Sequence, residues 1–212
     1  VRIALAVEAV LEEPEAVEAI RRITKSDMHL STRQPSQGKD ALWELDLHLF
    51  LQNRRILVRI QEPDLVVTFP DFLCEYGVAC KKVYSEDSVE KQLKKGCRQL
   101  LKTGIPGVVA FNLDDITPQS SILAQPTRLA ANDFLHARNI AFMERHRRVF
   151  QQAVMSGGCD AILLATTAQA DIEGMSPRFN RVTQVTLWTV NEAEAGTHIR
   201  IAALRRLIEG SS

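Results

Sequence analysis

An aspartate and a lysine stand at the ends of two short apolar runs in the stretch QEPDLVVTFPDFLCEYGVACKKVYSED, residues 61–87. If the two runs pair as a hairpin about a turn at residues 70–73, Asp64 lies opposite Ala79. Side chains two positions apart on a strand share a face, so Lys81 becomes a diagonal neighbour of Asp64, about 7–8 Å away between backbones. An acid that holds a divalent metal beside a lysine that orients a nucleophile is suited to phosphodiester hydrolysis.

The second lysine, Lys82, belongs to a basic stretch that continues into the next helix. Residues 81–102 hold seven cations against three acids, a local net charge of +4, whereas the net charge of the whole chain is +0. This stretch could grip a phosphate backbone, and the alternative is an ordinary solvated helix face. The cations that we assign to nucleic-acid binding are Lys82, Lys91, Lys94, Lys95 and Arg98.

The hydrophobic pattern predicts the strands and helices that must position these side chains. One helix is predicted over residues 40–55, with Asp40 as a candidate N-cap, and another over residues 85–104, which Gly104 ends. Apolar or β-branched runs bounded by turn residues predict three strands between them, at residues 56–61, 64–69 and 76–84.

The later part of the chain continues this alternation of strands and helices. We predict strands at residues 107–113, 159–168 and 181–190, and a long helix at residues 131–158. The whole pattern predicts an α/β fold with a mixed β-sheet flanked by helices. Residues 1–38 are predicted to be a helical N-terminal arm and linker, with Pro14 interrupting the helical pattern, and residues 39–212 to be the α/β domain.

Composition indicates a globular protein, since 45% of the residues are hydrophobic. No apolar run approaches the roughly 20 residues that cross a membrane, and acids interrupt the first apolar pattern, unlike in a signal peptide. We therefore expect a cytoplasmic protein without a membrane partner. The four cysteines form no CxxC pair and have no histidine at zinc spacing, so neither a zinc knuckle nor a disulfide framework is expected.

The order of these features resembles the PD-(D/E)xK restriction-endonuclease-like superfamily. An acid-bearing helix precedes EPDLVV, a hairpin leads to GVACKKVYS, and VEKQLKKGCRQL follows. The superfamily signature is Pro-Asp, a variable gap, then acid-x-Lys on the following strand, so Pro63-Asp64 matches its first half and Lys81 its last residue. The resemblance covers roughly residues 40–115 and implies a restriction-endonuclease-like core.

The resemblance also implies roles for other residues. Glu44 resembles the acid that many members place beside the metal, and Gln99 or Gln92 the helix glutamine that often lines their sites. Ala79 departs from the pattern, because the superfamily has Glu or Asp at this place. Three explanations stay open: the site no longer cleaves, the acid has moved to Glu44 or Glu90, or it was removed by substitution to inactivate the protein.

Two functional hypotheses of different classes follow. The first is a nuclease that hydrolyses DNA with Mg²⁺ or Mn²⁺ in restriction, repair or defence. Nucleases of the superfamily that the chain resembles often dimerise, so a homodimer is expected. Its expected metal ligands are Asp64, Glu44 and Glu90, and its expected catalytic residues are Asp64, Lys81, Glu44 and Gln99. The second is a non-catalytic module that binds nucleic acid or a protein on a nuclease fold. An unrelated α/β protein with an accidental resemblance is the third possibility.

Overall fold

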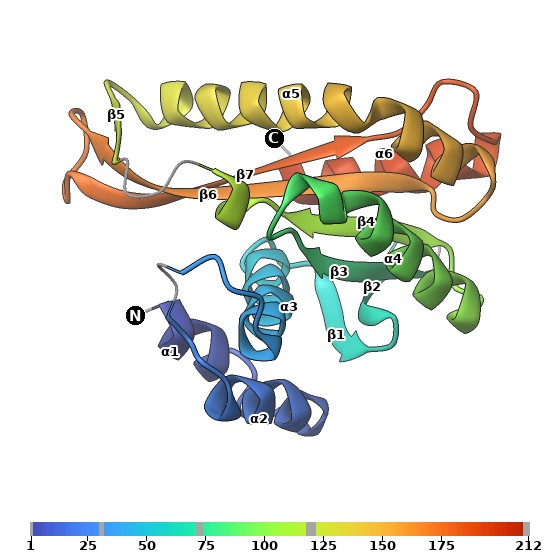
Figure 1. The fold of residues 1–212 in the computed structure, drawn as a ribbon, viewed down its shortest axis with the longest axis horizontal. Helices are drawn as coiled ribbons and strands as arrows, with labels where there is room; N and C mark the ends of the chain where they lie inside the picture. The colour runs from blue at the N-terminus through green and yellow to red at the C-terminus, as the bar shows by residue number, and fades with distance from the viewer. Residues whose placement is uncertain (1, 30–31, 71–73, 118–121, 210–212) are drawn as a thin grey trace.

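One seven-stranded mixed sheet organises the chain, as seen in a computed structural model that describes residues 2–29, 32–70, 74–117 and 122–209 (Figure 1). The strand order is β1-β2-β3-β4-β6-β5, and β7 pairs with β6. The strands are β1 (Leu57–Gln61), β2 (Asp64–Phe69), β3 (Cys74–Lys82), β4 (Gly107–Asn112), β5 (Leu123–Gln125), β6 (Ala161–Ile172) and β7 (Phe179–Trp188). The prediction of an α/β fold with a mixed sheet is confirmed.

The predicted hairpin register is also confirmed. Strands β2 and β3 are antiparallel, with Phe69 opposite Cys74 and Leu65 opposite Val78. Strand β1 adds antiparallel to β2, whereas β3, β4 and β6 run parallel. The turn predicted at residues 70–73 lies outside the described residues from position 71 to position 73.

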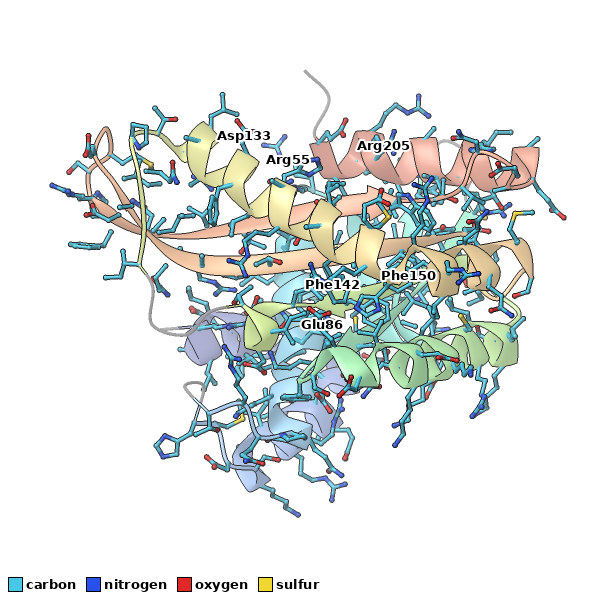
Figure 2. All side chains as sticks on the ribbon, turned by 45° about the horizontal axis from the view of Figure 1, so that its top comes forward. Arg55, Glu86, Asp133, Phe142, Phe150 and Arg205 are labelled. Atoms are coloured by element: carbon cyan, nitrogen blue, oxygen red, sulfur yellow. The ribbon has the colours of Figure 1, made fainter. Side chains whose placement is uncertain are left out.

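Helices cover both faces of the sheet (Figure 1). One apolar cluster joins α3 and α6 to residues such as Val78 and Cys80 of β3, and another joins α4 and α5 to the opposite face, which includes Ala79. Figure 2 shows Phe142 and Phe150 of α5 on the side of the helix that faces this second cluster. The helices in these layers are α3 (Gln37–Gln52), α4 (Val89–Thr103), α5 (Arg128–Met155) and α6 (Ala195–Glu209).

The first residues of the chain pack onto the domain. Helices α1 (Arg2–Glu8) and α2 (Val17–Lys25) flank a 3₁₀ turn (Pro14–Ala16), which agrees with the interruption predicted at Pro14. Their buried residues form a cluster with Ala41, Leu42 and Leu45 of α3. The predicted boundary between residues 38 and 39 falls inside α3, because the apolar faces of the two N-terminal helices are completed by that helix.

Helix α3 begins earlier than predicted. Its N-cap is Ser36, and Asp40 lies in its first turn. The prediction that Asp40 caps the helix is wrong, because its carboxylate accepts a hydrogen bond from the hydroxyl of Tyr84 at 2.9 Å. Helix α6 and the three-residue strand β5 were not predicted.

Helix α5 is 28 residues long and carries charged residues throughout its length. Among the described residues, no helix has both the length and the apolar composition that crossing a membrane requires.

The contact between β3 and β4 gives a test of the sheet. A Cβ at Gly107 would overlap the carbonyl oxygen of Gly77 and press on Leu100. We expect Gly107→Ala to lower the free energy of unfolding by about 2 to 4 kcal/mol, because a paired backbone cannot move aside cheaply. Urea denaturation measures the change. The matched control is Gly174→Ala, where a Cβ meets only the Pro126 carbonyl at 3.4 Å, and equal losses in both variants would contradict this contact.

Candidate functional site

An acid and a lysine meet at the carboxyl end of β3. Continuing the β2–β3 register places Asp64 opposite Ala79, and Lys81 on the same face is its diagonal neighbour. The Lys81 Nζ lies 2.9 Å from Oδ2 of Asp64, with only 11% and 16% of the two side chains exposed. The backbone N–H of Cys80 donates to the same Oδ2 at 2.7 Å. The predicted pairing of Asp64 with Lys81 is therefore confirmed as geometry.

Gln99 of α4 completes the surroundings of Asp64. Its Nε2 donates to the Pro63 carbonyl at 2.8 Å and to Oδ1 of Asp64 at 3.3 Å. Both oxygens of the carboxylate are thus held, Oδ2 by the strand and Oδ1 by the helix. The Oε1 of Gln99 is buried, and no hydrogen-bond partner for it occurs among the described residues.

Glu44 reaches the site from α3, on the other face of the sheet. Its carboxylate forms a bidentate ion pair with Arg22 of α2, at 3.1 Å from Nη1 to Oε1 and 2.5 Å from Nη2 to Oε2. Burial raises the pKa of Glu44, and the negative charge of Asp64 raises it further, while Arg22 and Lys81 act in the opposite direction. Glu44 and Asp64 therefore share one electrostatic environment although they come from different layers.

The pKa of Asp64 is raised as well, chiefly by burial. The positive charge and hydrogen bond of Lys81, the Cys80 N–H and Gln99 each lower it, but burial prevails. A carboxylate loses much of its hydration when it is buried, so the neutral form is stabilised relative to the charged form. The charge on this site is consequently sensitive to any change in its cations.

Sequence reasoning missed Arg22 and misread Asp40. Asp40 lies one helical turn before Glu44, and the charges of Lys81, Lys82 and Arg22 all act on its pKa, which burial raises. Its hydrogen-bond partner Tyr84 has a raised pKa from burial and from the charge of Asp40. The i, i+4 spacing of Asp40 and Glu44 was a signal that could have found Asp40.

Ala79 is fully buried beside Asp64. It packs in the α4-facing cluster with residues such as Leu93, Val109 and Phe111. Position 79 is therefore apolar and closed to water in this chain.

Two sequence assignments are corrected by the structure. Glu90 precedes Gln99 by nine residues on α4, so it lies about 13 Å away along the axis and on the opposite side of the helix. Its exposed carboxylate pairs with Lys94 instead. Lys82 is 8% exposed and is held by Asp115 at 3.0 Å and by Oδ1 of Asn112 at 2.8 Å, because neighbours on a strand face opposite ways.

The other basic residues follow one exposed side of α4. Their spacing of three and four residues makes them neighbours on the helix surface. With Asp87 and Glu90 they line a shallow hollow of about 480 Å³. We call this surface the α4 basic stripe, and it consists of Lys91, Lys94, Lys95 and Arg98.

The donor set limits which metal sites are feasible. Within the described part of the chain, no group of three or more His, Cys, Asp or Glu side chains is placed to hold a metal ion. Asp64 and Glu44 remain as two carboxylates, and each oxygen can accept more than one contact. Carboxylate oxygens are donors of the type that Mg²⁺ and Mn²⁺ prefer, and these hard cations keep several waters and often take only one or two protein carboxylates.

No protein-family model matches the sequence, no curated protein matches it, and no solved structure matches it. The structure alone therefore defines the class of protein: a mixed α/β protein with a mostly buried acid–lysine pair at the carboxyl ends of parallel strands. In open α/β sheets this edge is the usual place for ligands.

The raised pKa of Asp64 gives a second test. Since Lys81 lowers that pKa, Lys81→Met should move the titration midpoint of Asp64 to a still higher pH than in the parent protein. Carboxyl ¹³C NMR measures the Asp64 midpoint in the parent protein and in the variant. An Asp64 midpoint that does not rise in Lys81→Met would contradict the electrostatic coupling of the pair.

Proposed function

We propose that the protein is a metal-dependent nuclease with a restriction-endonuclease-like core, acting on DNA. The observation that supports this most is the Asp64–Lys81 pair, with Gln99 on the same carboxylate, at the carboxyl end of β3. These are the residues on which the resemblance to the PD-(D/E)xK superfamily depends.

Asp64 and Glu44 would hold the metal, and a bound Mg²⁺ or Mn²⁺ supplies Lewis-acid polarisation of the phosphoryl group and a more acidic bound water. The residues of the chain do the positioning. The Cys80 N–H and Gln99 fix the orientation of the Asp64 carboxylate, and Lys81 presents its ammonium group beside it. In a water-poor site that ammonium would orient a nucleophile and stabilise charge that develops on phosphate oxygens.

Glu44 would replace the acid that is missing at Ala79. The charge of Asp64 acts on Glu44, and α3 brings Glu44 towards the site from the opposite layer. Of the two migrated acids considered from the sequence, Glu44 is supported and Glu90 is not, since Glu90 is exposed on the far side of α4.

The α4 basic stripe would hold the phosphate backbone. Lys95 lies one helical turn before Gln99, so this stripe borders the side of α4 that faces Asp64. A strand of nucleic acid that follows the stripe would thereby be led towards the acid–lysine pair.

The second candidate is a non-catalytic module that binds nucleic acid or a protein partner. Two observations favour it: the second signature position is a buried alanine, and both oxygens of Glu44 are engaged by Arg22. This candidate keeps the stripe as the binding surface and assigns no chemistry to Lys81.

Cleavage assays separate the two candidates. We expect the parent protein to nick supercoiled plasmid or cut single-stranded DNA with Mg²⁺ or Mn²⁺ and not with EDTA. Asp64→Asn and Lys81→Met should each lower the rate about 100-fold or more, because each removes a group at the reacting phosphate. Asp87→Asn and Lys102→Met, which change exposed residues of the same types, are the controls. A parent protein that binds DNA and never cleaves it would support the second candidate.

Reversing the charge of the stripe tests how DNA is held. Lys91→Glu combined with Lys95→Glu should weaken DNA binding and reduce the dependence of affinity on salt, with a slope change of about 0.9 for each phosphate that the variant no longer neutralises. Fluorescence anisotropy at several salt concentrations measures both quantities. The control matches the change in net charge by comparing Lys95→Glu alone with Arg205→Glu, which reverses an exposed cation on α6 (Figure 2). Equal weakening in the control variant would assign binding to overall charge and not to the stripe.

A further inference from the structure

Arg22 of helix α2 contacts the proposed site, although α2 lies outside residues 40–115, the region that resembles nucleases. The Arg22 guanidinium grips Glu44 with two hydrogen bonds, and 28% of its side chain remains exposed. The charge of Asp64 also acts on Arg22. Arg22 is therefore part of the same charge cluster as the acid–lysine pair.

Each of the two carboxylates already has a cationic partner. Lys81 pairs with Asp64, and Arg22 pairs with Glu44. A divalent cation at Glu44 would have to share its oxygens with the guanidinium and would lie close to a like charge. Arg22 in this position thus competes with a metal for Glu44.

The same guanidinium suits a phosphate. Its planar fork matches carboxylate and phosphate oxygens equally well, and it can exchange one for the other without losing its charge. The Nε of Arg22 is a buried donor for which the described residues provide no hydrogen-bond partner. A phosphate at this place could therefore use donor capacity that Glu44 leaves unused.

Helix α2 packs closely on α3, so we expect an exchange of partners to require only rotation of the Arg22 side chain. A Cβ at Gly38 in α3 would come within 2.7 Å of the Ser26 Cβ and 3.0 Å of the Arg22 carbonyl oxygen, which shows how closely the two segments pack. Ala19 and Ile23 of α2 are buried in the cluster with α3.

We propose that Arg22 is a substrate-binding residue that exchanges partners: it holds Glu44 in the free protein and turns to a backbone phosphate when nucleic acid binds. This inference rests on the proposed nuclease function. Release of Glu44 then permits metal binding, so nucleic acid and metal bind cooperatively. By thermodynamic linkage, the factor by which DNA strengthens metal binding equals the factor by which metal strengthens DNA binding.

The test measures Mn²⁺ affinity by electron paramagnetic resonance, with and without a short phosphorothioate duplex. Alkaline buffer is required, because loss of Arg22 raises the pKa of Glu44 and only the ionised carboxylate binds metal. Asp64→Asn gives the background from Mn²⁺ on the duplex itself. In the parent protein the duplex should raise Asp64-dependent Mn²⁺ affinity about 10-fold.

Arg22→Gln should bind Mn²⁺ about 10-fold more tightly than the parent without duplex, gain little from the duplex, and bind the duplex more weakly. Arg21→Gln is the matched control, because Arg21 is the adjacent arginine of α2, is exposed and pairs with Glu18 on the same helix. Arg22→Lys keeps the charge and loses the planar guanidinium, so its Mn²⁺ affinity should lie between those of the parent protein and Arg22→Gln. If Arg22→Gln does not fold, Arg22→Lys provides the test.

Two negative results have separate meanings. Asp64-dependent Mn²⁺ binding that is unchanged or weaker in Arg22→Gln overturns the exchange and leaves the nuclease proposal standing, with Arg22 as a structural anchor of α2. Mn²⁺ binding that is equal in the parent and in Asp64→Asn, with or without duplex, overturns both.

Discussion

The Asp64 carboxylate must be stabilised in a mostly buried position, and the surroundings of the site follow from that requirement. Its Oδ2 takes the Lys81 ammonium and the Cys80 N–H, and its Oδ1 takes Gln99. A buried charge without such partners is strongly unfavourable. The strand register, the lysine and the position of α4 therefore depend on one another, because each supplies a contact to the same group.

Much of this arrangement could be predicted from local pattern. The side-chain period of a strand is two and the turn is short, so the pairing of β2 with β3 followed from the apolar runs, and with it the approach of Lys81 to Asp64. The same parity argument excluded Lys82 from that face. The parity argument could not show that Lys82 is buried, because its burial beside Asp115 depends on a distant segment of the chain. The sequence alone therefore predicts a surface cation at Lys82. Nuclease activity stays a prediction.

Other parts were beyond local pattern. Arg22 meets Glu44 across 22 positions of sequence, and nothing in its own neighbourhood marks it out. Glu90 carried the right chemistry, but its place on the far side of α4 depends on which helix face packs on the sheet. Helix α6 was detectable, since Thr197, Ile201 and Leu204 are buried at helical spacing.

Helix α3 has neighbours on two sides, the N-terminal helices on one and the sheet on the other. Asp64 is anchored by the sheet, whereas Glu44 is anchored by a helix that α2 also contacts. The separation of the two carboxylates is thus an adjustable quantity, because substitutions in the packing between α2 and α3 can alter it without touching a strand. In the proposed metal site, the preference among cations of different radius would then depend on residues that never contact the ion.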